Sequence, residues 1–203
     1  MPPLKRISKE DIVKAGYELV EERGIDSLNA RDLAKKLNCS VQPLFSNFDN
    51  MDSLKKEVLD YCYQKYNDYM KLSKDYKDTG IRYIRFAKIN PNVFKAIFTI
   101  PSERNAMECM INDESFKIIA INMKKMNNFT DEMIKDFHLK MWLFTQGIVS
   151  LILNHTCNFS DEEIELLLVE QYLALMNLMK LKTEFNLKSL KDYKNLEVRN
   201  EKI

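Results

Sequence analysis

Apolar residues recur at spacings of three and four along this chain, the period at which side chains line one face of an α-helix. Only four glycines and five prolines interrupt a sequence of 203 residues. Both features predict an all-α protein. A chain of this length holds one large domain or two small ones and can bury a sizeable core.

Several protein classes are disfavoured by the composition. No apolar run approaches the length of a membrane span, and the basic residues Lys5, Arg6 and Lys9 precede no apolar segment of a signal peptide. The cysteines are Cys39, Cys62, Cys109 and Cys157. Because they lie far apart and form no CxxC pair, we expect small core residues in a reducing compartment, not disulfides or a zinc site. The expectation is a cytoplasmic protein that needs no cofactor, metal or membrane.

The pattern of residues 29–48 predicts two short helices joined by a tight polar turn. The first helix should begin after Asn29, a favourable N-cap, with the carboxylate of Asp32 near the positive end of the helix dipole. The polar residues 38–40 then break the helical pattern. The inner face of this first helix is expected to consist of Leu33, Ala34 and Leu37.

The second helix of the pair follows the turn at 38–40. Ser40 is expected to cap it, and Pro43 then falls in the first turn, where a missing N–H costs little. Its buried face is expected to consist of Leu44, Phe45 and Phe48. Two short helices in this arrangement are typical of a helix-turn-helix, which places its second helix in the major groove of DNA.

Signals for further helices lie on both sides of this segment. Ser8 and Asp11 open a helix that should run to Arg23 and stop at Gly24. Asn50 is expected to cap a long helix. The remaining helices are predicted at 51–74, 78–90, 92–99, 102–127, 130–155 and 160–182.

The charge of the chain is close to balanced. The net charge is +1, and the first 56 residues carry ten basic against nine acidic side chains, again +1. This balance argues against strong non-specific attraction to DNA. It leaves room for a local basic rim, for which the candidates are Lys5, Arg6, Arg31, Lys35, Lys36, Lys55 and Lys56.

The order of these elements resembles the tetracycline-repressor (TetR/AcrR) family of transcriptional regulators. The resemblance covers residues 8–59, where the motifs are Arg31-Asp32-Leu33-Ala34 in the first helix of the pair and Leu44-Phe45-Ser46-Asn47-Phe48 in the second. A looser resemblance continues through Tyr83-Ile84-Arg85-Phe86-Ala87, Asn90-Pro91, Phe94, Trp142, Gln146-Gly147 and Leu151.

The resemblance implies a repressor that a small molecule releases from DNA. Residues 1–50 would form a three-helix DNA-binding head, and residues 51–182 a helical domain for effector binding and dimerisation. Residues 183–203 are expected to be a flexible tail. A homodimer formed through the helices near 130–155 and 160–182 would bind a palindromic operator in double-stranded DNA.

The chain departs from the family pattern at the DNA-facing helices. Asn38 stands where the family usually has a turn glycine, and Pro43 where it often has threonine. Phe45 lacks the hydroxyl with which the usual tyrosine meets a phosphate, and Met51 replaces a common phosphate-binding lysine. The alternative is therefore a ligand-binding helical module of the same fold with weakened or lost operator recognition.

The residues expected to contact DNA lie in both helices of the pair and at the start of the next helix. The amide of Gln42 can pair with adenine, while Asn29 and Arg31 would face phosphates. The complete candidate set is Asn29, Arg31, Ser40, Val41, Gln42, Pro43, Phe45, Ser46, Asn47 and Lys55.

Aromatic and methionine side chains in the second half of the chain are either plain core or the wall of an effector pocket. Methionine repacks easily around varied shapes, which suits a pocket for an uncharged, apolar effector. Gln146 and Asn122 are the candidate polar handles. The other pocket candidates are Phe86, Phe94, Phe98, Met107, Met110, Phe116, Met123, Phe137, Met141 and Trp142.

No catalytic activity is expected. The sequence contains no Gly-rich phosphate loop, no nucleophile–base arrangement and no metal-ligand spacing. His138 and His155 stand alone and are expected to be structural.

Overall fold

The computed structural model describes residues 7–98, 114–126 and 129–185, and all the regular structure in these ranges is helical. The all-α prediction is therefore confirmed for the described chain. The α-helices are α1 (Lys9–Arg23), α2 (Ala30–Lys36), α3 (Gln42–Asn47), α4 (Met51–Met70), α5 (Tyr76–Ile89), α6 (Pro91–Phe98), α8 (Glu114–Met126), α9 (Asp131–Leu153) and α10 (Asp161–Phe185). A short 3-10 helix, η1 (Ile25–Ser27), joins α1 to α2.

Several of the predicted helix ends are confirmed by their caps. Ser8 and Asp11 form a capping box at α1, and Gly24 ends that helix with a φ of 83°. The side chain of Asn29 accepts a hydrogen bond from the N–H of Asp32, and Asn50 caps α4. Each cap satisfies a backbone donor that the first turn of a helix leaves unpaired.

The predicted cap of α3 is wrong. Val41, not Ser40, is the N-cap residue, and it makes no side-chain capping bond. The reason lies in the preceding turn, where Asn38 adopts a left-handed φ of 51° and Cys39 donates its N–H back to Ala34 at 3.0 Å. The chain leaves α2 in this compact turn, so α3 begins one residue later than predicted, with Pro43 in its first turn.

Several boundaries differ from the prediction. Helix α4 ends at Met70 instead of 74, because Asp75 caps the next helix, which begins at Tyr76. Helix α10 continues to Phe185, into the predicted tail at 183–203. The helix predicted at 102–127 is seen from Glu114 to Met126 as α8, and its earlier part lies outside the described residues.

The connection between α4 and α5 is fixed by the carboxylate of Asp78. This side chain accepts hydrogen bonds from the N–H of Lys74 at 3.0 Å and from the Arg82 guanidinium at 2.9 Å. Burial alone raises the pKa of Asp78, but the two hydrogen bonds outweigh it and hold the pKa below its ordinary value. The group is therefore a carboxylate at neutral pH.

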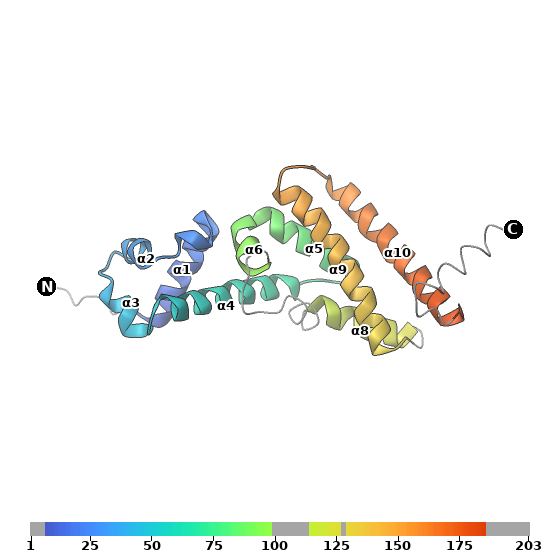
Figure 1. Ribbon diagram of the computed structural model, residues 1–203, viewed down its shortest axis with the longest axis horizontal. Helices are drawn as coiled ribbons and strands as arrows, with labels where there is room; N and C mark the ends of the chain where they lie inside the picture. The colour runs from blue at the N-terminus through green and yellow to red at the C-terminus, as the bar shows by residue number, and fades with distance from the viewer. Residues whose placement is uncertain (1–6, 99–113, 127–128, 186–203) are drawn as a thin grey trace.

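The helices form an elongated molecule (Figure 1). Helices α1 to α3 make a head at one end, and α4 runs from this head into a body that contains α5, α6, α8, α9 and α10. Helices α9 and α10 pack on each other, and α10 lies at the far end from the head.

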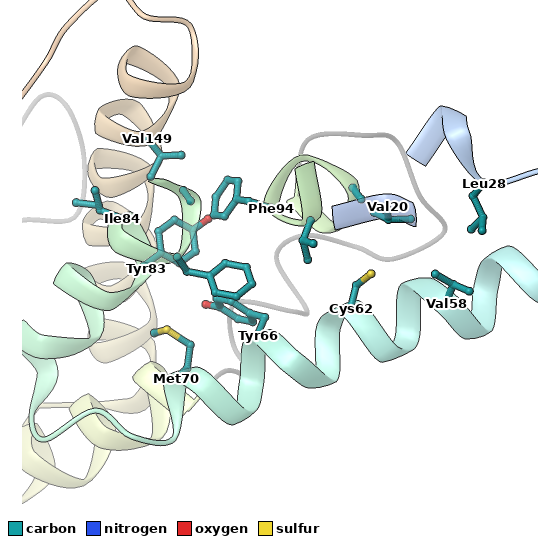
Figure 2. Close-up of a cluster of buried hydrophobic side chains, with 14 of the residues drawn as sticks. Val20, Leu28, Val58, Cys62, Tyr66, Met70, Tyr83, Ile84, Phe94 and Val149 are labelled. Atoms are coloured by element: carbon teal, nitrogen blue, oxygen red, sulfur yellow. The ribbon is translucent and has the colours of Figure 1, made fainter. Parts of the chain in front are cut away.

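A single hydrophobic core runs from the head into the body along α4 (Figure 2). At the head end, Val58 and Cys62 of α4 face Val20 and Leu28. At the body end, Tyr66 and Met70 face Tyr83 and Phe94. The ring of Tyr66 lies edge-on to the rings of Phe86 and Phe98, with centroid distances of 5.3 and 4.9 Å. Helix α4 is thus shared between both halves of the core.

None of the helices in the described part of the chain combines the length and the apolar character that crossing a membrane requires.

Candidate nucleic-acid interface and ligand pocket

The two short helices α2 and α3 are held against α1 by a small set of apolar side chains. Leu33 and Ala34 bury the inner face of α2, and Leu44 and Phe48 bury that of α3. The last two are four residues apart and so lie on one side of the helix. The opposite side of α3 is left on the molecular surface.

Phe45 lies at the molecular surface and not in the core. The prediction that it belongs to the buried face is wrong, since 48% of its surface is exposed. One residue of α-helix turns the side chain by about 100°, so Phe45 lies at the border of the face that Leu44 and Phe48 bury, and there it is half-exposed toward the outer side. Val41, one turn earlier, is 40% exposed.

The polar residues of α3 are exposed but not equally available. Ser46 donates its hydroxyl to the carbonyl of Gln42 at 3.0 Å, and Asn47 donates its amide to the carbonyl of Pro43 at 2.8 Å. Among the described residues, the side chain of Gln42 makes no hydrogen bond. Gln42 is therefore the α3 side chain with its full hydrogen-bonding capacity available to a partner. Ser40 is also exposed.

Carboxylates of α1 and α4 neutralise several basic side chains of the head. Lys36 pairs with Glu22 at 2.8 Å and with Glu18 at 3.1 Å, and hydrogen bonds to these two groups raise its pKa. Lys9 pairs with Glu57 at 2.6 Å. These pairs reduce the positive field of the head.

Four basic residues of the predicted rim form no ion pair within the described chain: Arg31, Lys35, Lys55 and Lys56. Arg31 lies at the start of α2 and Lys55 in the second turn of α4, and Figure 1 shows α3 near both of these helices. Asn29 is engaged by its own helix, because its amide donates to Asp32 at 2.9 Å. Lys5 and Arg6 lie outside the described residues.

A cavity of about 470 Å³ lies in the body, within the size range of small-molecule sites. Its wall combines residues of α4, α5, α8, α9 and α10 with Asp75, which precedes α5. The lining residues are Met70, Asp75, Tyr76, Lys77, Thr79, Gly80, Tyr83, Ile119, Asn122, His138, Met141, Trp142, Thr145, Leu168, Val169, Tyr172 and Leu173.

The polar groups of this wall are largely paired within the protein. The hydroxyls of Thr79 and Thr145 donate to helix carbonyls at 2.6 and 2.8 Å. The Tyr76 hydroxyl and Nδ1 of His138 are hydrogen-bonded at 2.9 Å. Lys77 pairs with Glu165 of α10 at 2.5 Å. Paired in this way, the wall presents mainly apolar surface.

Tyr172 lines the same cavity. Burial raises the pKa of its phenol above the ordinary value, so the ring is neutral at physiological pH. The cavity therefore gains no negative charge from this residue.

The structure brings only part of the predicted pocket set to this cavity. Met141 and Trp142 line it, and so does the candidate handle Asn122. Gln146 is not in the wall, and its amide oxygen accepts a hydrogen bond from Tyr83 at 2.7 Å. Met107 and Met110 lie outside the described residues.

The other predicted aromatic residues lie in the surrounding core. Phe86, Phe94 and Phe98 pack with Tyr66 and Tyr83 where α4, α5 and α6 meet. Phe116 and Phe137 each contact a lining residue: the ring of Phe116 is 5.4 Å from that of His138, and the ring of Phe137 is 5.4 Å from that of Tyr172. Met123 is buried and does not line the cavity.

The sequence prediction missed the contributions of α5 and α10 to the wall. Gly80, in the interior of α5, was the available signal. A Cβ at this position would lie 3.1 Å from Leu168 of α10, so the glycine permits a close approach of the two helices. A glycine inside a helix lowers helix stability and therefore often marks such a packing site.

No group of three or more His, Cys, Asp or Glu side chains within residues 7–98, 114–126 and 129–185 is arranged to hold a metal ion.

The fold defined by these observations is a three-helix head, with a helix-turn-helix arrangement, joined to a helical body through a shared long helix. No protein-family model and no curated protein matches the chain. A solved structure described as "putative regulatory protein SCO4313" is similar, with a TM-score of 0.61, over 83% of this chain and 95% of that one. The two sequences are 18% identical, so the likeness shows a common fold.

Proposed function

We propose that the protein is a DNA-binding transcriptional regulator of the tetracycline-repressor (TetR/AcrR) type, a repressor released by a small effector. The observation that carries the proposal is the exposed surface of α3, which includes Gln42, next to the helices α2 and α4 that carry the unpaired cations Arg31 and Lys55. The fold shared with a protein described as regulatory supports it.

In the proposed complex, Gln42 reads base edges while Arg31 and Lys55 contact phosphates. Gln42→Ala should change the preference at one base pair by about 1–3 kcal/mol. Arg31→Ala should instead weaken binding to all DNA sequences alike. It should also reduce the slope of log K against log salt concentration by about one for each lost phosphate contact. Selection from a random duplex pool, followed by titrations at several salt concentrations, measures both quantities.

The two variants serve as controls for each other. An unchanged selected sequence with Gln42→Ala would remove base reading from this residue. An unchanged salt slope with Arg31→Ala would remove its phosphate contact.

We further propose that the functional form is a homodimer made through α9 and α10. Leu143 and Leu151 of α9, with Leu166 and Leu173 of α10, leave large apolar side chains exposed on the two helices at the far end from the head. Large apolar side chains exposed on neighbouring helices favour an interface. A dimer of this kind would read two half-sites about one helical turn, or 34–36 Å, apart.

The cavity of the body is the proposed effector site. Its neutral, mostly apolar wall suits an uncharged apolar molecule, and Asn122 supplies a polar handle. Met70, at the end of α4, lines the cavity, while the start of α4 adjoins α3. A ligand that fits two positions of α4 with different affinity would therefore change the spacing of the recognition helices.

Trp142 provides a direct test of this effector site, because it is the single tryptophan of the chain and lines the cavity. Apolar ligands that enter should change its fluorescence and also lower the affinity for the selected duplex. Ligands that change the fluorescence but leave the DNA affinity unchanged would contradict effector release.

A second candidate function is a ligand-binding module without a defined operator. Two observations favour this second function. Phe45 and Met51 stand where the family that the sequence resembles commonly has phosphate-binding residues, and ion pairs neutralise Lys9 and Lys36. Binding to a promoter fragment at two salt concentrations separates the candidates, since purely non-specific binding fades with salt on every sequence alike. In both cases we propose a binding protein without catalytic activity.

A further inference from the structure

Beside the buried face of α3, its N-cap residue Val41 and Phe45 form a partly exposed apolar edge, the name used below for these two residues. The two residues are four apart and so lie on the same side of the helix. They are 40% and 48% exposed, although they lie on a surface proposed to meet a highly polar partner. Residues of these types are normally covered, and an exposed pair on a functional surface calls for a complementary apolar group on the partner.

The polar residues beside this edge do not compete with it. The donors of Ser46 and Asn47 are directed to carbonyls of their own helix, at 3.0 and 2.8 Å. Gln42 follows Val41 directly and retains its amide for a partner. The surface of α3 therefore includes the unengaged amide of Gln42 beside two apolar side chains, and Ser46 and Asn47 each spend one donor within the helix.

One occupant fits both the apolar edge and its electrostatic surroundings. Arg31, Lys35, Lys55 and Lys56 are cations without an ion pair in the described chain, on helices adjoining α3, and they favour a polyanion. In the major groove of DNA, the apolar group on a base edge is the C5 methyl of thymine. Double-stranded DNA thus supplies a negative backbone and an apolar spot within the same groove.

We propose that the apolar edge reads thymine C5 methyl groups, and that Gln42 pairs with an adenine next to them. This inference rests on the proposed function and adds the chemistry of the DNA half-site. The half-site would be a short run of A·T pairs in which at least one thymine methyl touches Phe45 or Val41. Phe45 carries no hydroxyl, so the exposed part of its ring offers the groove only apolar surface.

The test uses the full-length protein and a duplex selected by it from a random pool. Each thymine of one half-site is replaced, one at a time, by 2′-deoxyuridine, which keeps the base pair and lacks only the C5 methyl. At one or two positions, the Kd measured by fluorescence anisotropy should rise about fourfold, the factor that corresponds to burial of one methyl-sized group. The same change in both half-sites should raise it roughly sixteenfold, the square of that factor.

Three variants assign the effect to residues. Phe45→Ala and Val41→Ala, both at exposed positions, should weaken binding to the thymine duplex and reduce or abolish the difference between thymine and deoxyuridine. Ile89→Ala, at an exposed apolar position on α5 outside the proposed DNA-binding surface, is the matched control and should keep the difference.

Two results would overturn the inference and leave the proposed function standing. The first is a selected duplex whose Kd is the same with deoxyuridine at every thymine. The second is a methyl effect that persists in full in both Phe45→Ala and Val41→Ala. If the protein prefers no duplex at all, the proposed function fails and the inference falls with it.

Discussion

Gly16 sets how closely α1 and α4 pack. A Cβ at this position would lie 2.6 Å from Cγ2 of Val58 and 3.3 Å from Cδ1 of Leu28. Val58 is fully buried and β-branched, so it cannot easily turn away. Gly16→Ala should therefore lower the free energy of unfolding by about 1–3 kcal/mol through overpacking, as measured by urea denaturation.

The control for this prediction is a double-mutant cycle with Val58→Ala. The second substitution removes the atom that the new methyl would strike, so the double variant should lose less stability than the sum of the two single losses. Additivity within about 0.5 kcal/mol would show that the cost of Gly16→Ala has another origin.

Cys62 is a thiol made unreactive by its place in the core. Burial raises its pKa to about 12, so at pH 8 almost none of it is thiolate, the form that reacts with electrophiles. Cys157 is exposed. Brief treatment with iodoacetamide at pH 8, followed by peptide mass mapping, should label Cys157 and spare Cys62 until urea unfolds the protein. Equal labelling of both in the folded protein would contradict the buried position.

At the scale of the helices, two residues predicted as helix caps differ in their expected effect on stability. Asn29 accepts a hydrogen bond from the N–H of Asp32 at 3.0 Å, so Asn29→Ala should cost about 1 kcal/mol of stability. Ser40 caps nothing, and Ser40→Ala should stay within about 0.5 kcal/mol of the parent. Thermal unfolding of the two variants distinguishes them, and a larger loss at Ser40 would restore the cap predicted from the sequence.

The helices could be predicted from the sequence because their signals are local. The capping boxes at Ser8 and Asn50 and the stop at Gly24 each act within four residues of a helix end. The start of α3 could not be placed, since it depends on the backbone of Asn38, a residue that tolerates both hands of φ.

The candidate pocket was harder to predict because its wall is built from distant parts of the chain. Met141 and Trp142 were found because they are large and apolar. Phe86 and Phe94 have the same character yet lie in the core, and composition cannot separate the two environments. Whether an apolar residue faces a cavity depends on how closely α10 approaches α5. That distance is set by the contact of Leu168 with Gly80, two residues that are 88 positions apart in the sequence.

At the scale of the whole molecule, the proposed dimer makes the exposed leucines of α9 and α10 essential for assembly. Leu143→Glu should weaken self-association strongly, because it places a charge where an apolar contact is proposed. Light scattering coupled to size exclusion measures the mass of the species. Ile89→Glu on α5 is the matched control, since Ile89 is 63% exposed and Leu143 is 55% exposed.

The control should leave the mass unchanged. A monomeric parent protein at high concentration would contradict the dimer outright. A Leu143→Glu variant that remains fully dimeric would place the interface elsewhere.

The core shared along α4 limits how this protein could be re-engineered. Because Val58 and Cys62 complete the hydrophobic interior of the head, a chimaera that joined this head to a foreign sensor at the start of α4 would lose one wall of that interior. A workable junction would have to fall beyond Cys62 and preserve the aromatic stack around Tyr66. The head and the body are therefore not independently exchangeable, and a substitution in one half has to remain compatible with the packing of the other.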